Sequence, residues 1–141
     1  MDKEATLRWI GQLAERWVSE ETSDVTYCEQ DGSRWALRIR QTTRDFTTVW
    51  LEVGDRSLRY EAYILPAPVS NLEQVYRLCL RRNEKAWRVH FTLSDDSDLF
   101  LRGRLALELV SEHELESALG EIYELVEITF RPLLRSREKK A

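Results

Sequence analysis

The chain has 141 residues, with 21 basic and 25 acidic side chains and a formal net charge of −4. Hydrophobic residues at 43% and charged residues at 33% exclude an intrinsically disordered chain, and the length fits one globular domain. The longest uncharged stretch, 62–72, contains two prolines and is far shorter than the roughly 20 apolar residues of a membrane-spanning helix.

The beginning of the sequence and its cysteine content indicate the compartment. Met1–Glu4 lead directly into a charged, helix-like segment, which predicts no secretory signal and a cytoplasmic location. Cys28 and Cys79 lie outside any Cys-x-x-Cys spacing, so neither a disulfide framework nor a structural zinc site is indicated. Cys79 stands among apolar residues at helical spacing and is predicted to fill the core.

The first predicted element is a helix from Glu4 to about Glu20, because apolar residues recur on one side at the helical period. Between residues 25 and 65 the apolar period becomes two, which predicts four strands. Turn signals at Asp31-Gly32 and Gly54-Asp55 keep the connections short. An antiparallel meander is therefore expected.

The prolines of segment 66–68 end the meander, because proline cannot donate a hydrogen bond to a sheet. Ser70 followed by Glu73 is typical of a helix N-cap with a capping box. A helix is predicted from there to about Arg82, with Asn83 in the left-handed position that closes it.

A second hairpin is expected between residues 89 and 109, with the acidic segment Ser94–Ser97 as its turn. Gly103 interrupts the alternation of its returning strand and predicts a bulge or a close backbone approach. A long final helix opens at Ser111, and Gly120 within it predicts a closely packed neighbour. Residues 135–141 are expected to be a frayed tail.

This element order favours an α+β fold in one domain over residues 1–141. Its parts are a helix, a four-strand antiparallel meander, a second helix, a two-strand hairpin and a long C-terminal helix.

No catalytic signature stands out. The chain has no Gly-x-Ser-x-Gly elbow, no Gly-rich phosphate loop and no histidine pair at i, i+4. Three aspartates in segment 95–98 could attract a cation, but Leu101 and Leu107 stand where an EF-hand counted from Asp96 needs Gly and Glu. We therefore expect no catalytic, cofactor-binding or metal-binding residues, no cofactor and no small-molecule substrate.

Several phrases of the sequence resemble the YbjN-like family, whose fold is similar to that of type III secretion chaperones. The resemblance covers about residues 50–134, with Ser97 where the family tends to have glycine. It implies a loosely regulatory role without an established catalytic site, and its secretion relatives bind unfolded segments of other proteins as dimers. The matching phrases are Tyr-Ile-Leu-Pro-Ala-Pro at 63–68, Val-Tyr-Arg-Leu-Cys-Leu-Arg-Arg-Asn at 75–83, Asp-Ser-Asp-Leu-Phe-Leu-Arg-Gly-Arg-Leu at 96–105 and Glu-Leu-Glu-Ser-Ala-Leu-Gly at 114–120.

The leading functional hypothesis is a chaperone-like or adaptor module that binds a protein partner, or a second copy of the chain as a homodimer. Aromatic residues that oppose the apolar side of their strands are natural anchors for a partner. The competing interpretation is that helices or arginine stems cover these rings. The candidate protein-binding residues are Trp50, Tyr63, Phe100, Arg81 and Arg82.

The alternative hypothesis is regulation through contact with nucleic acid. A local run of basic residues from Arg77 to Arg88, and the arginines at 34, 38 and 40 on one strand face, could meet phosphates. Glu73, Glu84 and the acidic turn offer internal partners for the same arginines, and solvated helix faces normally look like this. Protein binding is therefore preferred.

Overall fold

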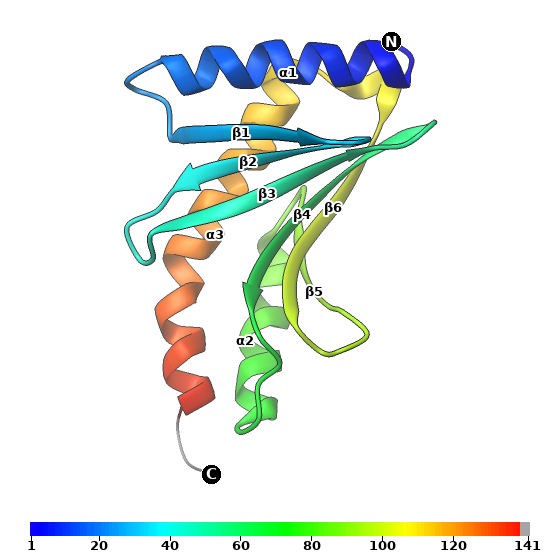
Figure 1. The fold of residues 1–141 in the computed structure, drawn as a ribbon. Helices are drawn as coiled ribbons and strands as arrows, with labels where there is room; N and C mark the ends of the chain where they lie inside the picture. The colour runs from blue at the N-terminus through cyan, green and yellow to red at the C-terminus, as the bar shows by residue number, and fades with distance from the viewer. Residues whose placement is uncertain (139–141) are drawn as a thin grey trace.

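The structure, a computed structural model that describes residues 1–138, has three α-helices, six strands and one short 3₁₀-helix among those residues (Figure 1). It confirms the α+β class. The likeness to secretion chaperones stays a prediction. The elements are α1 (Lys3–Ser19), β1 (Val25–Asp31), β2 (Arg34–Arg40), β3 (Phe46–Val53), β4 (Ser57–Leu65), α2 (Leu72–Lys85), β5 (His90–Leu93), β6 (Leu99–Ala106), the 3₁₀-helix Leu107–Leu109 and α3 (Glu112–Glu138).

The six strands form one antiparallel sheet in the order β1-β2-β3-β4-β6-β5. The predicted meander over β1 to β4 is therefore confirmed. The second hairpin joins the same sheet through β6, which pairs with β4 and leaves β5 at the edge. Each connection within the meander is short, so consecutive strands pair directly.

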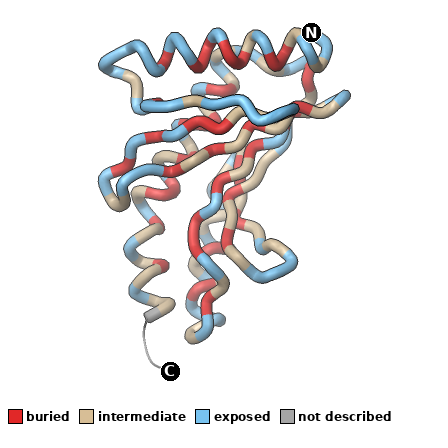
Figure 2. Tube along the Cα trace, viewed as in Figure 1, coloured by how far each residue is buried: buried red, intermediate tan, exposed pale blue. Residues whose placement is uncertain are grey.

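The helices lie on one side of the sheet, with α2 and α3 behind it in Figure 1 and α1 beside β1 and β2. In the central strands β3 and β4, residues alternate between buried and accessible, as the colours of Figure 2 show. The buried ones form a single core with the apolar sides of the helices. α1 is fixed by Trp35, whose indole N–H donates to the Leu7 carbonyl at 3.0 Å and whose ring packs against Gly11.

The start of α2 differs from its prediction. The helix begins at Leu72 after Asn71, which adopts a left-handed conformation with φ of 54°, and Ser70 is not its N-cap. The Ser70 hydroxyl instead donates to the Arg137 carbonyl at 2.8 Å, and the Asn71 side-chain amide donates to the Ser136 carbonyl. Contact with the end of α3 therefore replaces the local cap.

Both α2 and α3 end later in the sequence than predicted. α2 continues through Asn83 to Lys85, and the Asn83 side chain pairs with the backbone N–H and C=O of Phe91 on β5. α3 contains Pro132 and continues through residues 135–138, which were expected to be frayed. Its last turn carries the carbonyls that Ser70 and Asn71 bind, and this tertiary contact orders it. Residues 139–141 of the predicted tail lie outside the described residues.

A close neighbour was predicted at both Gly103 and Gly120, and the structure confirms it at only one of them. A Cβ at Gly103 would lie 2.0 Å from the Arg88 carbonyl oxygen, so the predicted close backbone approach is confirmed. A Cβ at Gly120 would meet nothing within 4 Å, so the prediction of a close neighbour there is wrong. Ser97, where the family tends to have glycine, adopts a φ of 66°, a conformation that glycine reaches without strain.

Candidate functional site: the open face of the sheet

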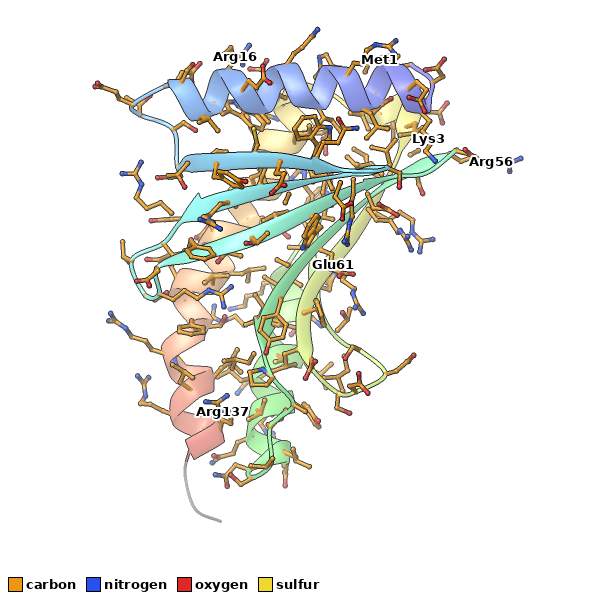
Figure 3. All side chains as sticks on the ribbon, viewed as in Figure 1. Met1, Lys3, Arg16, Arg56, Glu61 and Arg137 are labelled. Carbon is orange, nitrogen blue, oxygen red and sulfur yellow. The ribbon has the colours of Figure 1, made fainter. Side chains whose placement is uncertain are left out.

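Among residues 1–138, no helix covers one face of the sheet, and we call this face the open face. It consists of the even-numbered positions of β2, β3, β5 and β6, and the odd-numbered positions of β1 from Tyr27 and of β4 up to Tyr63. Glu61, labelled in Figure 3, lies near its middle. Six arginines against four carboxylates give it a net charge of +2 in a chain whose net charge is −4. These residues are Arg34, Arg38, Arg40, Arg59, Arg102 and Arg104, and Glu29, Asp31, Glu52 and Glu61.

Cross-strand pairing arranges β4 and β6 as three rungs on this face. Arg59 faces Arg104 at one end, Glu61 faces Arg102 in the middle, and Tyr63 faces Phe100 at the other end. The middle rung is an ion pair, with Arg102 Nε 3.0 Å from a Glu61 carboxylate oxygen. The face therefore changes from basic to aromatic along the two strands.

Guanidinium groups lie over most of the aromatic rings of the open face. The distance from guanidinium carbon to ring centroid is 3.9 Å for Arg34 over Trp50 and 4.3 Å for Arg102 over Phe100. Arg38 lies between the rings of Phe46 and Tyr27, at 4.1 and 5.1 Å. Cation–π attraction and the apolar arginine stems thus hold half-buried rings at the surface.

Two shallow hollows adjoin on the open face. The larger, of about 490 Å³, is lined by the arginines at 34, 59, 102 and 104 together with Glu52 and Trp50. The smaller, of about 230 Å³, is lined by Arg44, Phe46, Tyr63 and Phe100. Trp50 and Glu61 belong to both hollows, so the two form one continuous depression.

Three of the five predicted binding residues come together in this depression. Trp50 and Phe100 are half-buried, and Tyr63 is 44% exposed, with its ring edge-on to Phe100 at a centroid distance of 5.5 Å. The expectation that arginine stems cover the rings holds for Trp50 and Phe100. Arg81 and Arg82 lie on α2, which packs on the other side of the sheet, and are not part of this site.

Sequence reasoning missed Phe46, Arg59 and Arg104. Each stands on the outward parity of its strand, which was visible in the alternation of apolar residues. What alternation alone does not reveal is that β4 pairs with β6, because these strands are separated by α2 and β5. That pairing places Arg59 opposite Arg104.

The basic run of the alternative hypothesis is engaged in ion pairs at both ends. Arg77 Nη2 lies 3.2 Å from a carboxylate oxygen of Glu73, and Arg88 binds Glu114 through two nitrogens at 3.0 and 3.2 Å. Arg88 is also held through its backbone N–H, which donates to Glu121 at 2.8 Å. The Arg88 guanidinium is therefore already bound to a carboxylate of the same chain.

The aromatic end of the open face is positioned by the loop between β2 and β3. Arg44 in this loop donates to the Ile64 and Tyr63 carbonyls, both at 2.9 Å, and its guanidinium lies 5.0 Å from the Phe130 ring centroid. Burial lowers the pKa of Arg44, but the guanidinium keeps its hydrogen bonds. The loop is thereby tied to β4 on one side and to α3 on the other.

Glu127 of α3 binds the same loop through five hydrogen bonds. The backbone amides and hydroxyls of Thr42 and Thr43 donate to its carboxylate, as does the Gln41 side-chain amide at 2.7 Å. Burial raises the pKa of Glu127, but the bonds from Thr42, Thr43 and Gln41 together outweigh it and hold this pKa at about 2. We call this contact the Glu127 latch.

Within residues 1–138, no group of three or more His, Cys, Asp or Glu side chains is placed to hold a metal ion. Cys79 is buried as predicted, and burial raises its pKa to about 12, so its thiol is protonated at neutral pH. In the same part of the chain, no helix is long and apolar enough to cross a membrane. That the chain is not an enzyme stays a prediction.

The fold and the open face define a small α+β domain that presents one side of its sheet to its surroundings. The chain belongs to the YbjN family, because the family model described as "YbjN: Putative bacterial sensory transduction regulator" matches residues 13–135.

Its curated relatives include longer proteins of mycobacteria. The uncharacterized proteins Rv0487 of Mycobacterium tuberculosis and Mb0497 of Mycobacterium bovis are each 40% identical to it over 84 residues, which is 60% of this chain and 46% of theirs. The uncharacterized protein ML2442 of Mycobacterium leprae is 34% identical over 119 residues, 81% of this chain and 65% of its own. The chain thus spans about half the length of the first two relatives.

Proposed function

We propose that the chain is a non-catalytic protein-binding module of the YbjN family that acts in the cytoplasm as a regulatory adaptor or chaperone-like factor. The observation that carries this proposal is the open face, where aromatic rings and arginines gather around a shallow depression. Aromatic residues and arginine are the side chains most enriched in the energetically dominant parts of protein interfaces.

The shape of the depression supports a macromolecular partner over a small molecule. Sites for small molecules are concave and enclose most of their ligand. The open face instead offers two adjoining shallow hollows on one side of a sheet. Tyr63 and Phe46, at 44% and 42% exposure, provide apolar surface there that a partner could cover. The regulatory description of the family agrees with such a role.

Nucleic-acid contact by the Arg77–Arg88 run stays an alternative prediction. The ion pairs at both ends of the run do not favour it.

The experiment is affinity isolation from a bacterial lysate with the wild-type chain and two variants, followed by quantitative mass spectrometry. The open-face variant combines Tyr63→Ser with Phe100→Ser. The control is Leu80→Ser on α2, which removes a side chain that is 68% exposed on the other side of the sheet. Proteins enriched by the wild type should be lost with the open-face variant and kept with the control. Equal recovery by all three proteins would contradict the proposal, provided that all three melt at similar temperatures.

A further inference from the structure

Arg59 and Arg104 are exposed and stand directly opposite each other across β4 and β6. Like charges in directly opposed positions destabilise a sheet. Neither arginine has a carboxylate within 4 Å among the described residues. Glu52, the other cross-strand neighbour of Arg59, accepts a hydrogen bond from the Ser33 hydroxyl at 3.3 Å. An anion bound between the two guanidinium groups would remove their repulsion.

The same two strands carry the aromatic rung Tyr63–Phe100 four residues away, after Arg59 on β4 and before Arg104 on β6. Four residues of extended chain span about 13 Å. In an extended polypeptide, side chains at positions i and i+4 point to the same side at this separation. The basic and aromatic ends of the ladder are therefore spaced to meet two side chains of one extended segment.

We propose that the open face binds an acidic, extended polypeptide segment in which a carboxylate and an aromatic side chain are four residues apart. The carboxylate lies between Arg59 and Arg104, and the aromatic ring packs on Tyr63 at the edge of Phe100. This inference rests on the proposed function and specifies the chemistry of the partner. It agrees with the net charge of +2 on the open face.

The residues around the basic and aromatic ends of the β4–β6 ladder favour a polypeptide over a single-stranded nucleic acid. Stacking of successive bases needs several accessible ring faces, but Arg34 covers Trp50 and Arg102 covers Phe100. A single aromatic side chain needs only the ring of Tyr63, which is 44% exposed. Glu52 and Glu61 line the same hollow as the four arginines and would repel a continuous row of phosphates. Discrete carboxylates separated by neutral residues meet neither obstacle.

The test uses a fluorescein-labelled peptide with the core Glu-Ser-Thr-Ser-Phe, and binding is followed by fluorescence anisotropy. One comparison peptide replaces Glu by Gln, and a second moves Phe by one position, so that its ring points to the opposite side. Single-stranded oligothymidylate is the nucleic-acid probe. The protein variant combines Arg59→Gln with Arg104→Gln. Its matched control combines Arg77→Gln with Arg81→Gln on α2, which removes the same charge from the other side of the sheet.

We expect the acidic peptide to bind the wild type and the α2 control alike. The Arg59/Arg104 variant, and either change in the peptide, should weaken binding about tenfold, as expected for the loss of a charge-assisted contact or an apolar anchor. Equal losses in both double variants would overturn the inference, as would no binding of the peptide, or tighter binding of oligothymidylate. Any of these results can occur while the affinity isolation still recovers proteins that depend on the open face. In that case the inference of an acidic segment fails and the proposed function stands. If no protein depends on the open face, the proposed function itself fails.

Discussion

Gly103 and Gly120 have opposite surroundings, although both interrupt a regular element. A Cβ at position 103 would overlap the Arg88 carbonyl oxygen at 2.0 Å, whereas one at position 120 would meet nothing. We expect Gly103→Ala to lower the free energy of unfolding by about 3 kcal/mol, because backbone on the other side cannot yield cheaply. Gly120→Ala should raise it by about 0.5–1 kcal/mol, because alanine is the better helix former.

Urea denaturation of the two variants and the wild type measures both effects, and each variant is the control for the other. The free energies should move in opposite directions at an unchanged denaturant dependence. Loss of stability in both variants, or in neither, would contradict the packing described around these glycines.

The surroundings of a single residue could be predicted where the neighbouring sequence determines them. Gly103 interrupts an alternating strand, and that pattern already indicates a close approach. A glycine within a helix looks the same in sequence whether or not a neighbour packs on it, so the surroundings of Gly120 could not be foreseen. Ser70 is a similar case, because its hydroxyl binds the Arg137 carbonyl at the far end of the chain.

At the scale of elements, the Glu127 latch joins α3 to the loop between β2 and β3. The pKa of Glu127 is about 2 in the folded chain and near 4.5 in an ordinary environment. A lowered pKa contributes stability that is fully present above about pH 4.5 and is lost as the pH falls towards 2. Glu127→Gln should therefore lower the free energy of unfolding by about 1–2 kcal/mol at pH 7, the worth of hydrogen bonds to a charged group.

The measurement is denaturation of the wild type, Glu127→Gln and the control Glu124→Gln between pH 7 and pH 2. Glu124 is exposed on the same helix. The difference between the wild type and Glu127→Gln should shrink as the pH falls below about 4.5, while Glu124→Gln follows the wild type throughout. A difference that is independent of pH would show that the latch does not depend on the charge of the carboxylate.

The strands and helices themselves follow from periodicity, whereas their ends depend on tertiary contacts. Alternation over residues 25–65 was enough to predict four strands and their antiparallel pairing. The start of α2 and the end of α3 were misplaced because each is completed by the other, through Asn71 and the Ser136 carbonyl. Donors from Gln41 to Thr43 meet a carboxylate more than eighty positions away, and no local pattern reveals such a contact.

At the scale of the whole molecule, the sheet has one side that forms the hydrophobic core with the helices and one side that stays accessible. Strand parity was sufficient to place Trp50, Tyr63 and Phe100 each on the accessible side of its own strand. It could not show that Arg81 and Arg82 lie on the other side of the sheet, because the position of α2 depends on its packing against β5 and α3. Nor could it bring Arg59 and Arg104 together, since that requires the long-range pairing of β4 with β6.

Site-specific photo-cross-linking tests most directly whether the open face is the protein-binding surface. A photoreactive phenylalanine analogue would replace Tyr63 on the open face in one protein and Leu80 on α2 in another, both at exposed positions. After irradiation in bacterial cells, position 63 should form covalent adducts of discrete mass with other proteins, and position 80 should not. Adducts at position 80 with none at position 63 would contradict the assignment of function to the open face.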